Sequence, residues 1–169
     1  MVFNKAWWLI FLTGSIFTCA ILFISCTPRS ILSEGGATIA VWDLDNLSPS
    51  ASGNPDMGQI LSTRITETIM SGGKVTVIER ERLLLALEEL NLGSSSLADE
   101  ATRLKLGRLV GAQAMVFGAY QVFGQTMRLD LRLVEVGTGK VMKAVQKTTP
   151  DMNVSQWLEA AREAAEGLL

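Results

Sequence analysis

The 169-residue sequence contains no histidine and only two cysteines, Cys19 and Cys26. Histidine is the commonest general base and the commonest transition-metal ligand, so its absence argues against hydrolytic triads and zinc sites. We interpret Cys19 as an ordinary small residue of an apolar run, and Cys26 directly follows that run. The remainder of the chain therefore offers no disulfide and no cysteine nucleophile.

An excess of charge of either sign is also missing. The chain has 15 basic and 17 acidic residues and a formal net charge of -2, which loss of Lys5 with the N-terminal segment would change to about -3. This balance indicates neither nucleic acid nor an acidic membrane surface as a partner.

What the sequence does contain is a stretch without any charge, from Ala6 to Ser25, preceded by Lys5 and followed by Cys26. A basic start, an apolar middle and small residues before a cysteine are typical of a bacterial lipoprotein signal. The stretch is also long enough to span a bilayer of roughly 30 Å, so an uncleaved anchor helix is the alternative. We expect residues 1–25 to be the signal and Cys26 to carry the lipid.

Subtracting these 25 residues from 169 leaves 144, which suits one domain with its own core. Residues 26–36 read as the lipidated cysteine and a linker, and residues 37–169 as the domain. Apolar and β-branched runs predict strands, and apolar residues recurring at three and four positions predict helices. The strands expected are 38–46, 74–79, 114–123, 127–136 and 140–149, and the helices expected are 55–71, 80–91, 96–109 and 154–168. The order βαβααβββα predicts a single mixed-sheet α/β sandwich domain.

Asp43 and Asp45 lie at the end of the first predicted strand, and two carboxylates where a strand emerges into an exposed loop suit a divalent cation. Termination of the strand is the simpler interpretation, because no glycine-rich phosphate loop follows. The run Glu79–Arg82 is expected to be a solvated face, and Asn46 is expected to order its own loop. We therefore predict no catalytic residue, no cofactor and no metal ion, and a protein that is not an enzyme.

Several blocks together resemble the CsgG family of outer-membrane lipoproteins, and they occur in that family's order. They are Ile39–Asn46, Val77–Arg80, Leu87–Gly93, Leu106–Ala112, Val116–Gly118 and Val134–Val141. The resemblance implies an outer-membrane, periplasm-facing lipoprotein that acts in envelope assembly or export. The chain is also similar to the lipoprotein LpoB and to the N-terminal domain of TolB, which implies a binding module.

The sequence departs from the curli secretion channel in having no room for membrane-spanning hairpins, since a membrane strand needs about 9–11 residues. Our leading hypothesis is a non-catalytic lipoprotein that works through protein contacts, with the membrane reached through the lipid on Cys26. The alternatives are an accessory subunit of a channel ring, a contact activator of a cell-wall synthase, and a nucleotide- or metal-binding enzyme. The partners implied are a channel-type relative, a secretion substrate or a cell-wall synthase, and a homo-oligomer stays open.

The contact residues themselves are weakly indicated. Exposed loops often carry binding residues, so Ser48–Asn54 and Ser94–Ala98 are the candidates. Trp42 and Trp157 are expected in the core, because an apolar strand surrounds the first and a helical stripe the second.

Overall fold

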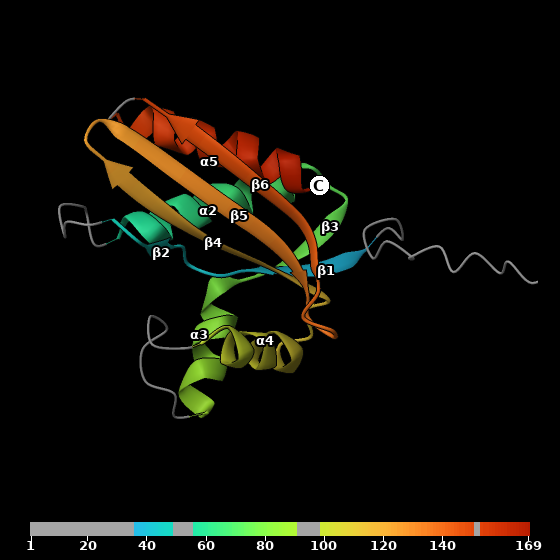
Figure 1. Cartoon of the computed structure of the whole chain (residues 1–169). Helices are drawn as coiled ribbons and strands as arrows, with labels where there is room; N and C mark the ends of the chain where they lie inside the picture. Colours follow the sequence, from blue (N-terminus) through green and yellow to red (C-terminus); the bar gives the residue numbers. More distant parts are fainter. Residues whose placement is uncertain (1–35, 49–55, 91–98, 151–152) are drawn as a thin grey trace, which may run out of the picture. The chain divides into compact units, whose positions relative to one another are not determined.

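The computed structural model of the chain describes residues 36–48, 56–90, 99–150 and 153–169 (Figure 1). Its strands are β1 (Ala37–Val41), β2 (Asp45–Asn46), β3 (Val75–Ile78), β4 (Ala114–Phe123), β5 (Thr126–Glu135) and β6 (Val141–Thr149). Its helices are α2 (Met57–Ser71), α3 (Arg80–Glu89), α4 (Glu100–Leu109) and α5 (Val154–Leu168). The predicted mixed α/β architecture is confirmed.

All the described strands form one sheet in the order β3-β1-β4-β5-β6, and the short strand β2 also pairs with β4. Strand β1 is parallel to both β3 and β4, whereas β4, β5 and β6 are successive antiparallel neighbours. Short turns join these last three strands, and crossovers through helices join the parallel ones, as each pairing requires. The sheet is therefore mixed, as the sequence predicts.

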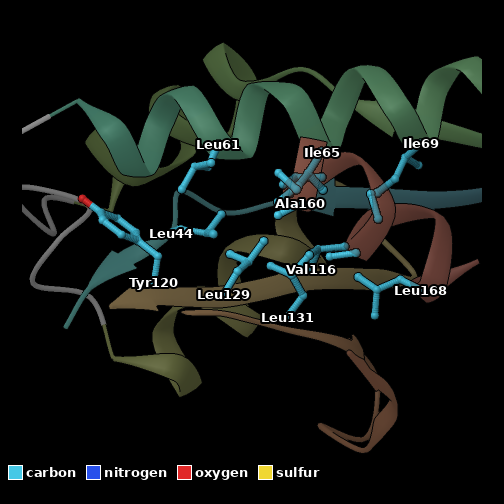
Figure 2. Packing of buried hydrophobic residues seen from close by; sticks show 14 of the residues in the cluster. Leu44, Leu61, Ile65, Ile69, Val116, Tyr120, Leu129, Leu131, Ala160 and Leu168 are labelled. Atoms are coloured by element: carbon cyan, nitrogen blue, oxygen red, sulfur yellow. The ribbon is translucent and has the colours of Figure 1, made fainter. Parts of the chain in front are cut away.

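One face of the sheet packs against α2 and α5. Figure 2 shows Leu61, Ile65 and Ile69 of α2 pointing toward Val116 and Leu129 of the sheet. The alternation predicted for β5 is confirmed, since Met127, Leu129, Leu131 and Leu133 are at most 1% exposed. Trp157 of α5 joins this cluster, so its predicted place in the core is confirmed.

The opposite face packs against α3 and α4, over one end of the sheet only (Figure 1). Its cluster contains Trp42, Leu83, Leu87, Met115 and Phe117. Residues of β4 thus alternate between the two clusters, and the strand is covered on both faces at its start. The expectation that Trp42 is buried is also confirmed.

The structure differs from the sequence-based expectations in two details. The first predicted strand, 38–46, is interrupted: β1 ends at Val41, and Asp45 and Asn46 form the separate strand β2, because they pair with Ala119 and Tyr120 of β4. The helix predicted over 80–91 ends at Glu89, and Leu90, the residue after it, is 42% exposed. Helix α4 begins at Glu100 with Asp99 as its N-cap, and its predicted start at Ser96 lies outside the described residues. The predicted start of the first helix, at Pro55, also lies outside them.

Candidate functional site

The crossover between β1 and α2 carries the two aspartates that the sequence singled out. Asp43 accepts hydrogen bonds from Arg80 at the start of α3, with Nη2 to Oδ2 at 2.6 Å and Nε to Oδ1 at 3.0 Å. The hydroxyl of Ser62 on α2 donates to the same carboxylate at 3.1 Å. Charge-assisted bonds from a planar guanidinium are strong and orienting, so Asp43 ties α3 and α2 to the end of β1.

Asp45 has a separate arginine. Arg103 of α4 donates from Nη1 to Oδ2 at 2.8 Å and from Nη2 to Oδ1 at 3.0 Å, and its guanidinium carbon lies 5.4 Å from the centre of the Trp42 ring. A cation over an indole face is attracted by the ring quadrupole. The two aspartates therefore bind arginines of two different helices, α3 and α4, and form two separate ion pairs rather than one site.

These pairings bear directly on the metal hypothesis. Both carboxylates are engaged by guanidinium groups, and in the described ranges there is no group of three or more His, Cys, Asp or Glu side chains able to hold a metal ion. The hydrogen bonds that Arg80 donates to Asp43 raise the pKa of the guanidinium, although partial burial acts in the opposite direction. Arg80, a cation at ordinary pH like any arginine, therefore remains a charged partner of Asp43.

The loop after β2 is ordered by its own side chains. The Asn46 carboxamide oxygen accepts a hydrogen bond from the Ser48 amide at 2.9 Å, which confirms the local role expected for Asn46. The Ser48 hydroxyl in turn accepts from the amide of Val122 at 3.0 Å. The rest of the candidate loop 48–54 lies outside the described residues, as does 94–98.

A hollow of about 640 Å³ lies on the sheet face that α3 and α4 leave uncovered. Its floor is made by β4, β5 and β6, and one wall is the start of α4. Its lining residues include Asp45, Leu47, Glu100, Arg103, Ala119, Asp130, Arg132, Ala144 and Gln146. We call this surface the open sheet face.

Charges on the open sheet face are paired with one another. Arg132 of β5 lies 3.3 Å from Glu100 of α4, and Arg128 lies 2.8 Å from Asp130 on the same strand. The hydrogen bonds to Asp130 raise the pKa of Arg128. Exposed ion pairs of this kind contribute little to the stability of the fold. Their charged groups stay in contact with water, so this surface can make polar contacts.

Leu47 and Phe123 give the open sheet face an apolar margin. Leu47 is 55% exposed and lines the hollow, and its amide donates to the Tyr120 carbonyl at 2.9 Å, which fixes it beside β4. Phe123 ends β4 and is 51% exposed. Aromatic and aliphatic side chains beside polar groups are a composition found at protein interfaces.

The glycine-containing run at the end of α4 is structural. Gly107 packs so closely that a Cβ there would lie 2.4 Å from the Met115 sulfur, and Gly111 has a positive φ of 81° after the helix. Arg108 donates to the carbonyl of Val136 at 3.2 Å and so holds the β5–β6 turn. The run 107–112 ends α4 close to the helix end predicted at 109, whereas a phosphate-binding loop opens a helix.

Sequence reasoning missed the arginines that complete this region. The sequence pattern places Arg80 in a solvated charge run and gives no indication of a role for Arg103. Their partners are 37 and 58 positions away, respectively, and no local spacing signals such a pair. Only the packing of α3 and α4 on the sheet brings them together.

Cys26, the predicted lipid attachment site, and the apolar segment before it lie outside the described residues. In the described segments, none of the helices combines the length and apolar character needed to cross a membrane. Lipidation of Cys26 stays a prediction.

Known proteins of similar fold are found among solved structures. The C-terminal domain of LpoB from Salmonella enterica matches with a TM-score of 0.59 and 21% identity, over 69% of this chain and 84% of that one. Lipoprotein GNA1162 from Neisseria meningitidis gives 0.53 and 18%, over 74% and 92% of the two chains. A PelC dodecamer from Paraburkholderia phytofirmans gives 0.52 and 14%, over 76% and 85%. At these identities the likeness establishes the fold alone.

No curated protein matches the sequence. The family comparison is more specific: residues 27–128 match the family described as "Curli production assembly/transport component CsgG". The match ends within β5, so the resembling block Val134–Val141 lies beyond it. Because the match spans more than half of the sequence and agrees with the fold, the chain belongs to the CsgG family.

Proposed function

We propose that the chain is a non-catalytic envelope lipoprotein that acts through protein contacts in assembly or export. Residues 1–25 would be its signal, Cys26 would carry the lipid, residues 26–36 would include the linker, and the domain 37–169 would face the periplasm from the outer membrane. A single acyl chain binds a membrane only marginally, so several chains on Cys26 would make attachment lasting.

The observation that carries the proposal is the open sheet face in a chain of the CsgG family. Helices α2 and α5 cover one face of the sheet, whereas α3 and α4 cover only part of the other. The remainder of that face presents paired charges with Leu47 and Phe123 at its margin. This combination of paired charges and exposed apolar side chains suits recognition of a protein surface.

A contact role also agrees with the state of the acidic groups. Asp43 and Asp45, the carboxylates with the best placement for chemistry, each face an arginine at hydrogen-bond distance. The oxygens of both carboxylates already accept hydrogen bonds from these guanidinium groups, so neither carboxylate is free to take a proton from a substrate.

We further propose that the protein has no pore hairpins of its own. Only Gly124 and Gln125 separate β4 from β5, and five residues separate β5 from β6. Arg128, Asp130 and Arg132 share one face of β5, and charged side chains facing lipid cost about 2–4 kcal/mol each for arginine or lysine at the bilayer midplane. These strands are better suited to water.

The anchor is tested by replacing Cys26→Ser in the natural host, followed by fractionation. We expect the variant in the soluble periplasmic fraction and the unmodified protein in the outer membrane. If the variant stays in membranes, the apolar segment acts as an anchor helix and the lipoprotein assignment is wrong.

The contact role is tested by affinity capture of the detergent-solubilised, lipidated protein from its envelope. Ala144→Arg adds a bulky cation to the open sheet face at an exposed site, and Thr63→Arg places the same change on the exposed side of α2. We expect Ala144→Arg to lose the captured partner and Thr63→Arg to keep it. Equal capture by both variants would show that the open sheet face is not the contact surface.

A ring is the second candidate, since the PelC structure of similar fold is a dodecamer. Light scattering of the solubilised protein separates the two arrangements. A large homo-oligomer, or a ring that includes a channel-type relative, would favour the accessory-subunit alternative. A small complex with a cell-wall synthase would favour the contact-activator alternative.

A further inference from the structure

Strand β6 is the outermost strand of the sheet next to β5, and it is nine residues long. In an antiparallel pair, alternate residues direct their backbone N–H and C=O groups away from the neighbouring strand. The outer side of β6 therefore presents a row of backbone donors and acceptors, which is the template that an added strand needs. Most of its side chains are exposed or half-buried as well.

The charge on this edge has one sign. Lys143 and Lys147 are the ionisable residues of β6, and the strand contains no acid. In the register with β5 they lie opposite Leu133 and Leu129, so both project from the face that α5 covers. Lys147 contacts Glu163 of α5 at 2.7 Å, while Lys143 is exposed and has no ion pair with a described carboxylate.

These lysines disfavour a second copy of the chain as the added strand. Two β6 strands in antiparallel pairing overlap fully when Val145 lies at the centre, and this register places Lys143 of each copy opposite Lys147 of the other. Like charges directly opposite each other are destabilising, and shifted registers lose backbone pairs at the ends.

The same charges favour a partner strand that carries acids. We propose that β6 accepts an extended segment of another protein, with carboxylates four positions apart that lie opposite Lys143 and Lys147. Small neutral residues of that segment would lie beside Ala144 and Gln146 on the other face. Lysines on an edge both reject self-pairing and select an acidic strand. The inference rests on the proposed contact role and specifies the partner.

The probe for this inference is a synthetic peptide of the length of β6, with glutamate at its third and seventh positions and threonine or valine elsewhere. Fluorescence anisotropy measures its binding to the full-length protein in detergent. We expect Lys143→Glu to weaken binding about five-fold, since the reversal replaces a cross-strand attraction by a repulsion between like charges directly opposite each other. Lys74→Glu, an exposed site just before the opposite edge strand β3, is the matched control and should change nothing.

Backbone pairing is tested separately with two peptides that are N-methylated at odd or at even positions. One of them should lose binding and the other should retain it, because only alternate amides face β6. Hydrogen exchange should slow at alternate amides of residues 141–149 when the unmethylated peptide is bound.

Three results would overturn the inference: no binding of the acidic peptide, equal weakening by Lys143→Glu and Lys74→Glu, or equal binding by both methylated peptides. Any of these outcomes leaves the anchorage by Cys26 and the capture result at Ala144 unchanged. Failure of the edge inference is therefore distinguishable from failure of the proposed function.

Discussion

Substitution of Gly58 by alanine tests how α2 is fixed against the crossover that carries the two aspartates. Gly58 is the second residue of α2, and a Cβ at this position would lie 2.2 Å from the Leu44 carbonyl oxygen and 3.3 Å from its carbon. The Leu44 amide also donates to the Gly58 carbonyl at 3.4 Å. The start of the helix and the backbone between Asp43 and Asp45 are thus in direct contact.

Two effects of opposite sign act in Gly58→Ala. Alanine is favoured over glycine in a helix by up to about 1 kcal/mol. A carbon and a carbonyl oxygen normally approach no closer than about 3.3 Å, so the helix must move by roughly 1 Å. Overpacking usually costs about 1–3 kcal/mol, and here the obstacle is backbone rather than a flexible side chain. We expect a net loss of about 1–2 kcal/mol of unfolding free energy.

Thermal unfolding of the full-length protein in detergent, followed by circular dichroism, measures this loss. For a chain of this size, 1 kcal/mol shifts Tm by about 2–4 °C, so Gly58→Ala should lower it by roughly 2–8 °C. Gly137→Ala is the control, because no atom lies within 4 Å of the added Cβ and its φ is not positive. An unchanged or raised Tm for Gly58→Ala would refute the argument from close approach.

Three further outcomes are expected. Asp43→Ala and Arg80→Ala should each lower the unfolding free energy by about 1–2 kcal/mol, with a double variant clearly less destabilised than the sum, as measured in urea; additive losses would contradict the coupling. Hydrogen bonds from Thr102 lower the pKa of Asp99, so its stabilisation is full above its ordinary value of 3.8 and declines as pH falls through the lower folded value. The difference in unfolding free energy between the unmodified protein and the Asp99→Asn variant should therefore be smaller at acid pH than at neutral pH. The same difference at pH 7 and at pH 3 would contradict this expectation. Trp157→Ala should cost about 3–5 kcal/mol in the same urea assay, because the ring is buried against the sheet; a loss below about 1 kcal/mol would be inconsistent with that burial.

Local chemistry explains why most element boundaries were predictable. The alternation of leucines with Arg128, Asp130 and Arg132 determines that β5 has a buried and a hydrated face, whatever its neighbours are. Gly111 ends α4 through its positive φ, and the β-branched run Val75–Ile78 favours a strand. These signals act within a few residues and are therefore readable from the sequence.

Long-range pairing explains the failures. Strand β2 is only two residues long and forms because Asp45 and Asn46 pair with β4. A strand of two polar residues has no apolar run that could predict it as a separate element. The same holds for Arg103, whose partner Asp45 is 58 positions away. A contact of this kind depends on how helices pack on the sheet, and this is not encoded in local spacing.

The sequence by itself determined the mixed α/β class, the order of the predicted elements and the resemblance to the CsgG family, because hydrophobic periodicity and turn residues act locally. Only the tertiary structure decided that Asp43 and Asp45 bind two separate arginines and that the described helices cover one sheet face only in part. The reason is physical: ion pairs and exposed faces arise where distant segments meet or fail to meet, and their energies depend on that arrangement rather than on neighbouring residues.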